Sequence, residues 1–288
     1  MGEISEALRR ARLERAARPA SPEPPETSIA RDVANALSPP PRSDESPKPK
    51  PPRIEIHETP HEVSPARAVI LDSHGAPAEA ARHIALRVRR ELEARRARSV
   101  AVISSERAEG KTTVACNLAL AIASLSRGRV VALVDLDLRK PSVARVLEIP
   151  HEHGIDDVLR GHCPLATARI EIDKPELDVY PARGPQQNAH ELLVARAFAS
   201  LVAELEQRYE VTVFDTPPTL LVPDAAVIVE RVGAAIAVSR SGRTRLRAFE
   251  QMVDVMPPGK LVGAVLNEGA LASANGEYGY YGGTPQPD

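Results

Sequence analysis

The stretch Ser104–Thr113 has the residue types and the spacing that bind phosphate. It reads Ser-Ser-Glu-Arg-Ala-Glu-Gly-Lys-Thr-Thr, and it departs from the pattern GxxxxGK[ST] only where Ser105 stands in place of the first glycine. Lys111 is spaced to reach the outer phosphates of a nucleotide, and the Thr112 hydroxyl is spaced to ligate Mg²⁺. The residues predicted to bind the nucleotide are Ser105, Glu106, Arg107, Ala108, Glu109, Gly110, Lys111, Thr112 and Thr113.

Two carboxylates follow a second apolar run, at residues 130–134. Asp135 and Asp137 are two positions apart, and a basic pair at 139–140 comes directly after them. Because side chains alternate along a strand, the two carboxylates should lie on the same side while the chain stays extended. A single aspartate at a strand end is often only a helix cap. Two of them beside a basic pair favour a catalytic role at the ligand-binding edge of a sheet.

A third apolar run, at residues 211–214, ends in Asp215 and is followed by Thr-Pro-Pro. This layout is typical of a Walker B element, whose aspartate belongs to the Mg²⁺ shell. The predicted metal-binding residues are Thr112, Asp135 and Asp215.

These stretches require elements that bring them together. An apolar run at 100–103 precedes the phosphate loop and a helical run at 114–126 follows it, so backbone N–H groups at a helix N-terminus would face the anion. The continuous Val, Leu and Ala runs indicate strands buried on both faces, hence a parallel sheet. We therefore predict a doubly wound, mostly parallel α/β sheet with helices on both faces, as in P-loop NTPases. Further buried strands are predicted at 177–180, 234–238 and 261–267, and helices at 77–98, 154–161 and 191–209.

Composition divides the chain into four parts. Thirteen of the 27 prolines lie in the first 65 residues. We predict a short amphipathic helix at 1–18, a disordered Pro-rich linker at 19–65 and a folded domain at 66–270. The part 271–288 is predicted to be a disordered tail. It nevertheless holds Tyr278, Tyr280 and Tyr281, three of only five tyrosines. A low-complexity or docking tail is one interpretation, and a set of phosphoacceptors is the other.

Charge and cysteine content exclude some classes of protein. The formal net charge of −2 gives no whole-chain argument for nucleic acid or membrane binding, and two distant cysteines make no disulfide framework. The sequence has no run of about 18 apolar residues, so neither a membrane span nor a signal peptide is expected.

Two local clusters have alternative interpretations. The arginines at 240–247 indicate a solvated face, or a contact with nucleic acid or an acidic partner. The histidines at 151–162 match no standard metal spacing.

Taken together, the motifs resemble the bacterial tyrosine kinases of exopolysaccharide and capsule biosynthesis, of the cytoplasmic CpsD/CapB-like type within the ParA/MinD-like P-loop superfamily. The resemblance covers residues from about 78 to the C-terminus. It depends on the phosphate loop, on 134–141 as the additional Walker A′ element, on 215–218, and on the tyrosine-rich tail. Weaker matches lie at 154–161, 188–193, 223–225 and 263–267.

The resemblance implies an autokinase that uses ATP and Mg²⁺ to phosphorylate Tyr278, Tyr280 and Tyr281. Lys111, Asp135 and Asp137 would be catalytic, since a phenol of pKa near 10 needs a carboxylate to take its proton. It also implies a homo-oligomer, a Wzz-like membrane polysaccharide co-polymerase as activator, and a cognate tyrosine phosphatase. The chain would be cytoplasmic, held at the inner face of the membrane through that partner, with no nucleic acid expected.

One departure and two alternatives accompany the resemblance. Family members often carry Glu-x-x-Arg-x-x-Arg before the first strand for ring formation; here Glu79 and Arg82 fit but position 85 is Ala. The first alternative is a ParA/MinD-like partitioning or positioning ATPase. Those proteins have a lysine early in the phosphate loop where this chain has Glu106, which reverses the charge. The second alternative is a nucleotide-gated adaptor without kinase activity.

Overall fold

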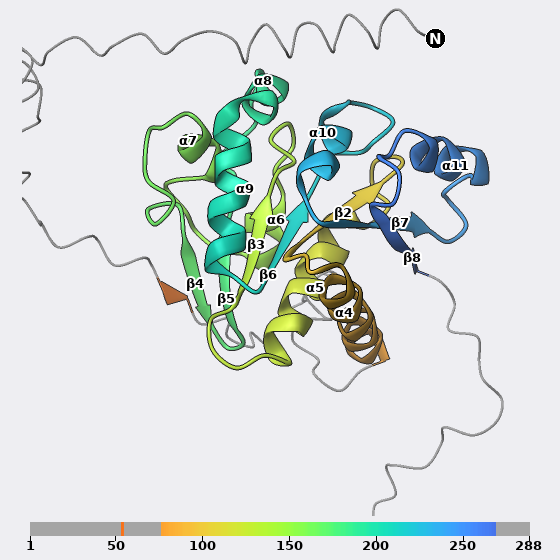
Figure 1. Ribbon diagram of the computed structural model, residues 1–288, viewed down its shortest axis with the longest axis horizontal. Coiled ribbons are helices and arrows are strands. Elements are labelled where there is room, and N and C mark those ends of the chain that lie inside the picture. The colour runs from red at the N-terminus through yellow and green to blue at the C-terminus, as the bar shows by residue number, and fades with distance from the viewer. Residues whose placement is uncertain (1–52, 55–75, 269–288) are drawn as a thin grey trace, which may run out of the picture. The chain divides into compact units, whose positions relative to one another are not determined.

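The computed structural model describes residues 53–54 and 76–268, and eight strands of these residues form one sheet in the order β1-β4-β5-β3-β6-β2-β7-β8 (Figure 1). Strands β5, β3, β6, β2, β7 and β8 run parallel to one another, and β4 runs antiparallel to β5. The strands are β1 Arg53–Ile54, β2 Ser99–Ser104, β3 Val131–Asp135, β4 Ile170–Asp173, β5 Glu176–Tyr180, β6 Val211–Asp215, β7 Ala234–Arg240 and β8 Leu261–Asn267. The predicted parallel sheet is confirmed.

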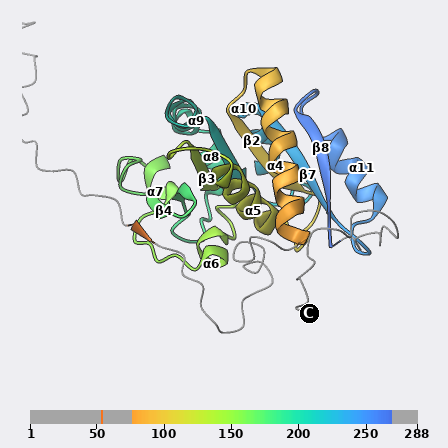
Figure 2. The ribbon, with the colours of Figure 1, turned by 90° about the horizontal axis from the view of Figure 1, so that it is seen from below.

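Helices cover both faces of this sheet. Those of the described residues are α4 Ala76–Arg95, α5 Lys111–Ser124, α6 Val143–Leu147, α7 Ile155–Leu159, α8 Ala189–Val194, α9 Arg196–Arg208, α10 Asp224–Arg231 and α11 Leu246–Asp254. Helices α4, α5 and α6 share one buried apolar cluster with the sheet, and α4 and α5 lie side by side in Figure 2. Helices α7 to α11 share a second cluster on the opposite face.

Alternation along the strands explains why two clusters form. In β2, Val100 and Val102 belong to the first cluster, whereas Ala101 and Ile103 belong to the second. All six residues of β2 are buried, as are all five of β3 and of β6. Such strands have no polar face to alternate with the apolar one, which is why the sequence shows continuous apolar runs.

Three sequence predictions need correction. The helix predicted at 191–209 is two helices, because Ala195 adopts an extended conformation between α8 and α9. Strand β8 is not buried: it pairs only with β7, and Leu266 is 63% exposed. The antiparallel strand β4 was not predicted, and neither were the short helices α6 and α10.

The other boundaries agree with the sequence to within a few residues. The helix predicted at 77–98 is α4, the one predicted at 154–161 is α7, and the one predicted after the phosphate loop is α5. The helix predicted at 1–18 and the tail at 271–288 with Tyr278, Tyr280 and Tyr281 lie outside the described residues. So does the linker predicted at 19–65, except for Arg53–Ile54, which form the short strand β1 where disorder was predicted.

Candidate active site

The phosphate loop lies between the end of β2 and the start of α5. Gly110 is the N-cap residue of α5 with φ of 92°, and Ala108 also has a positive φ, of 60°. Glycine adopts a left-handed backbone without steric strain, and at Gly110 this conformation turns the chain sharply into α5. Lys111 is the first helical residue, so the loop and the free N–H groups of α5 form one anion-binding surface.

Glu109 holds this loop in shape from within. Its side chain is buried, and its carboxylate accepts hydrogen bonds from the Ser105 hydroxyl at 2.9 and 3.0 Å and from the Glu106 N–H at 2.7 Å. The Thr244 hydroxyl, from the loop after β7, also donates to it. Ser105 therefore has a structural partner in the place where the pattern expects glycine. Glu106 itself is exposed.

The last residues of β7 and β8 also contact the phosphate loop. The Asn267 side-chain amide donates to the Glu109 carbonyl at 3.0 Å, and Arg240 donates to the Ala108 carbonyl at 3.0 Å. A Cβ atom on Gly110 would lie 1.9 Å from the Asn267 amide nitrogen, so a side chain at this position would displace the Asn267 amide from the loop. Asn267, Arg240 and Thr244 were not among the predicted site residues, because no local pattern links them to a loop about 130 residues or more away.

Lys111 lies among carboxylates at the carboxyl edge of the sheet. Its Nζ atom is 3.1 Å from Asp215 Oδ1 and 4.0 Å from Asp137 Oδ2. Burial by itself lowers the pKa of Lys111, but the charges of Asp215, Asp137 and Asp135 outweigh burial and raise it. The Thr112 hydroxyl donates to Asp215 Oδ2 at 2.7 Å. The structure thus brings Lys111, Thr112, Asp137 and Asp215 together.

Asp135 and Asp137 differ in their surroundings. Strand β3 ends at Asp135, whose Oδ2 accepts the N–H groups of Ser142 and Val143 at 2.9 and 3.0 Å. Burial, and then the nearby charge of Asp215, raise the pKa of Asp135 to about 8. Burial raises the pKa of Asp137 to about 6, against the opposing charge of Lys111. Asp135 therefore fixes the start of α6, and Asp137 is the carboxylate of this pair that lies beside Lys111.

Three polar side chains form a chain of contacts beside this edge. Asp224, buried at the start of α10, accepts from Arg139 Nε at 2.8 Å through Oδ2. Its Oδ1 lies 2.8 Å from His190 Nδ1. Neither His190 nor Asp224 was predicted as a site residue, since each stands alone in its segment.

The donor set suits one Mg²⁺ ion bound together with a nucleotide. Mg²⁺ prefers six oxygen ligands and usually takes only one or two from carboxylates, with phosphates and water supplying the rest. Thr112 offers a hydroxyl, and Asp215 offers a carboxylate within hydrogen-bonding distance of it. Across the part of the chain that the structure describes, no group of three or more His, Cys, Asp or Glu is arranged to hold a metal alone.

Fold and site together define the class. A doubly wound parallel sheet, a phosphate loop between β2 and a helix, and aspartates at the ends of β6 and β3, the next two strands on one side of β2, are the marks of a P-loop nucleotide-binding protein. The family model described as ParA, "NUBPL iron-transfer P-loop NTPase", matches residues 96–180.

Comparison with named proteins narrows the class. The chain is 33% identical over 190 residues to tyrosine-protein kinase YwqD of Bacillus subtilis, a match that covers 65% of this chain and 79% of the relative. It is 32% identical over 176 residues to tyrosine-protein kinase wzc of Salmonella typhi, covering 60% of this chain but only 24% of that longer protein. The solved kinase domain of the Escherichia coli tyrosine kinase ETK superposes with a TM-score of 0.66 at 27% identity, over 79% of this chain and 88% of that one.

This chain belongs to the bacterial tyrosine kinase family. The resemblance seen in the sequence is confirmed, and neither the partitioning ATPase nor the adaptor is better supported. Among the residues that the structure describes, no helix is both long enough and apolar enough to span a bilayer.

Proposed function

We propose that this kinase transfers the γ-phosphoryl group of ATP to Tyr278, Tyr280 and Tyr281 of another copy of the same chain. The convergence of Lys111, Thr112, Asp137 and Asp215 at one sheet edge is the observation that carries this proposal. It supports the proposal because Lys111, a cation suited to the outer phosphates, lies next to a carboxylate that can accept a proton.

The residues at this edge of the sheet and the bound nucleotide account for each bond and proton in the transfer. The acceptor phenol attacks the γ-phosphorus, the bond from that phosphorus to the β–γ bridging oxygen breaks, and ADP leaves with the electron pair. Asp137 takes the phenolic proton, and burial helps, since it raises the pKa of this carboxyl to about 6 and makes it a stronger base. Lys111 neutralises charge on the phosphates. Mg²⁺, held by Thr112 and Asp215, would supply further charge neutralisation and orientation.

Burial of the other two tyrosines supports the choice of acceptors. Tyr180 and Tyr209 are 0% and 2% exposed, and their hydroxyls lie 2.7 Å apart. The Tyr209 hydroxyl also donates to Asp178 at 2.5 Å. Neither phenol can enter another active site while the domain is folded. Of the five tyrosines in the chain, the three at 278–281 are the ones left for phosphorylation.

We further propose that the protein regulates polysaccharide polymerisation and export at the inner face of the membrane, recruited by a membrane polysaccharide co-polymerase. The family resemblance supports this part of the proposal. A homo-oligomer is part of it as well. The motif that forms rings in the family is incomplete here, although Arg82 does form an ion pair with Glu79.

A mixing experiment with the full chain tests the function. Lys111→Met keeps its tyrosines but should lose catalysis. The triple variant with Phe at positions 278, 280 and 281 keeps the active site but has no acceptors. With labelled MgATP, each variant alone should stay unlabelled, and the mixture should label only Lys111→Met on its C-terminal peptide. ADP release without labelled peptide, in the mixture and in the wild-type protein, would contradict kinase activity and favour an ATPase.

A further inference from the structure

Arg139 is anchored through one nitrogen and leaves two others at the surface. Its Nε donates to the buried Asp224 carboxylate at 2.8 Å, while the Arg139 side chain is 38% exposed and that of Asp224 is 1% exposed. Among the residues that the structure describes, the Nη atoms of Arg139 have no hydrogen-bond partner. An arginine held in this way presents a fixed pair of donors with the geometry that matches a phosphate.

Asp224, which holds Arg139, is itself held in place by its helix and by a second side chain. Asp224 is the first residue of α10, where the helix dipole favours a negative charge, and its second oxygen contacts His190 of α8 at 2.8 Å. Since a carboxylate only accepts hydrogen bonds, His190 Nδ1 carries the proton of this contact. Both oxygens of Asp224 are thus used, and the carboxylate cannot rotate away from Arg139 without losing His190.

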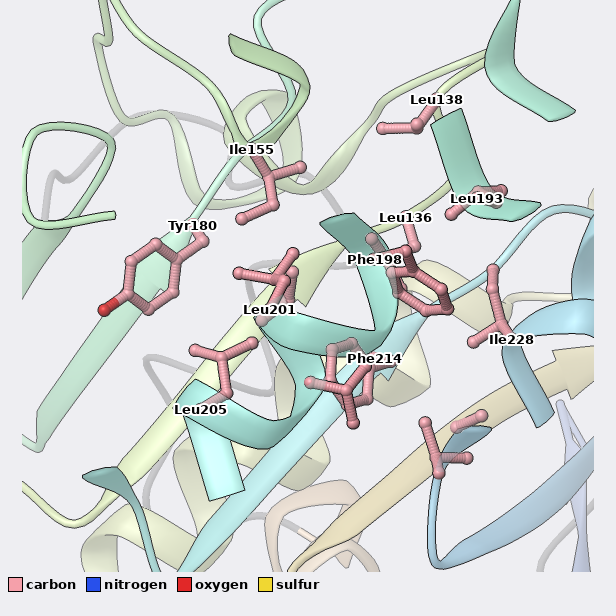
Figure 3. Close-up of a cluster of buried hydrophobic side chains, with 14 of the residues drawn as sticks. Leu136, Leu138, Ile155, Tyr180, Leu193, Phe198, Leu201, Leu205, Phe214 and Ile228 are labelled. Carbon is pink, nitrogen blue, oxygen red and sulfur yellow. The ribbon is translucent and has the colours of Figure 1, made fainter. Parts of the chain in front are cut away.

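Apolar side chains also connect the three segments that carry Arg139, His190 and Asp224. Leu138 precedes Arg139, Leu193 follows His190 by three residues, and Ile228 follows Asp224 by four. These three leucine and isoleucine side chains are buried in one cluster (Figure 3). The backbone of residues 136–140 therefore cannot move without disturbing both α8 and α10.

Arg139 belongs to the turn that carries Asp137, since the Lys140 N–H donates to the Asp137 carbonyl at 3.0 Å and to Asp137 Oδ1 at 3.1 Å. It comes two residues after Asp137, and the charge of Asp137 is one cause of the raised pKa of Arg139, after the hydrogen bond and charge of Asp224. The opposite charges of Arg139 and Asp137 are thus close enough to interact at the same edge of the sheet. The free donors of Arg139 therefore come from the same turn as Asp137, whose Oδ2 lies 4.0 Å from Lys111 Nζ.

We propose that Arg139 binds the phosphoryl group during transfer and that Asp224, with His190 behind it, is the positioning residue that aims Arg139. This inference depends on the proposed kinase function and deepens it. Asp224 touches no substrate atom, so it acts through Arg139 alone. His190 restrains Asp224 and contributes less.

The first test changes Arg139 itself in the full chain. Arg139→Ala should lower kcat for tail phosphorylation by about 10²-fold, the usual loss for one donor to developing charge, with KM for ATP changed less than about threefold. Arg139→Lys should lose most of the rate too, because one ammonium group cannot pair with Asp224 and reach the phosphate together. Arg208→Ala is the matched control: Arg208 is also 38% exposed and also paired, with Glu204 at 2.9 Å.

The second test is a double-mutant cycle. Asp224→Asn should lower kcat by about 10- to 100-fold in the wild-type background, in the range seen when an outer partner of an active-site group is removed. In the Arg139→Ala background it should lower kcat no further. Methylguanidine in solution should restore part of the rate to Arg139→Ala, and less to the double variant, because that variant lacks the carboxylate that holds the guanidinium group. His190→Ala should give a smaller loss than Asp224→Asn.

The outcomes separate this inference from the kinase proposal. Additive losses in the cycle, or a wild-type kcat in Arg139→Lys, would overturn the positioning role while leaving kinase activity in place. If the wild-type protein only hydrolyses ATP, the kinase proposal fails, and the same cycle read on ADP release still decides whether Asp224 acts through Arg139. Should Asp224→Asn fail to fold, the result for Arg139→Lys decides alone, because Arg139 lies at the surface.

Discussion

At the scale of residues, the site is a cluster of carboxylates around one ammonium group. Asp215 and Asp137 lie within 4.0 Å of Lys111 Nζ, and all three side chains are at most 10% exposed. Buried charges are costly unless they are paired. In this cluster, burial and repulsion between carboxylates raise the pKa of Asp135 to about 8, far from the ordinary value of 3.8.

The shift of Asp135 predicts a pH dependence of stability. Because the folded protein keeps this proton to a higher pH than the unfolded chain, the free energy of unfolding should fall as pH rises from about 4 to about 8. Asp135→Asn should remove part of that slope. Thermal unfolding without nucleotide or Mg²⁺, at several values from about pH 5 to about pH 8, measures it. Asp254→Asn, exposed at the end of α11, is the control and should keep the wild-type slope. Equal slopes for all three proteins would contradict the assignment.

How far the sequence predicts the site depends on local pattern. The loop motif predicts Lys111 and Thr112 because their roles follow from spacing within one turn. The alternation of side chains along a strand predicted that Asp135 and Asp137 lie on the same face of the sheet. However, β3 ends at Asp135 and the chain then turns. Thr244 and Asn267 contact the phosphate loop only because β7 and β8 extend the sheet on that side, and no local spacing encodes this.

At the scale of elements, α8 and α10 support the segment that carries Asp137. The sequence predicted one helix at 191–209, because Glu, Leu and Ala continue across the break at Ala195. The break lets α8 turn over the edge of the sheet while α9 packs on its face, as Figure 1 shows. Short elements such as α6, α10 and β4 have too few residues to show a periodicity of their own.

Truncation of a buried apolar side chain beneath this segment should lower the free energy of unfolding. Leu193 is 1% exposed and is buried in the same apolar cluster as Leu138 and Ile228 (Figure 3). Leu193→Ala should lower the free energy of unfolding by about 2–5 kcal/mol, from lost transfer energy and the cavity left behind. Ile228→Val, which deletes one methylene group from the same cluster, should cost only about 0.5–1.5 kcal/mol. Denaturant titration followed by circular dichroism measures both, and equal losses would contradict this packing.

At the scale of the whole molecule, the site and the end of the last strand lie at the same edge of the sheet. Four strand spacings separate β3, which ends at Asp135, from β8, or about 19 Å at about 4.8 Å each. Tyr281 is 14 residues beyond Asn267, a reach of at most about 46–50 Å when extended. That length exceeds the distance across the sheet, so the tail is long enough for a tyrosine to extend beyond its own domain, as phosphorylation of a neighbouring copy requires.

Phosphorylation should then loosen the proposed homo-oligomer. Three phosphates add about −5 of charge at neutral pH, which is large beside the formal net charge of −2. Like charges gathered near one interface repel one another, and salt screens that repulsion. Light scattering should therefore show the mass of the wild-type assembly falling after MgATP is added, and falling less at high salt.

Two variants distinguish charge repulsion from an effect of the nucleotide itself. Lys111→Met tests whether catalysis is needed, and the triple Phe variant at 278, 280 and 281 tests whether the acceptors are needed. Both should keep their mass when MgATP is added, because neither gains phosphate on its tail. If the triple Phe variant assembled and dissociated like the wild-type protein, the charge on the tail would not be the cause. ATP turnover at the site formed by Lys111, Asp137 and Asp215 would then drive dissociation by itself.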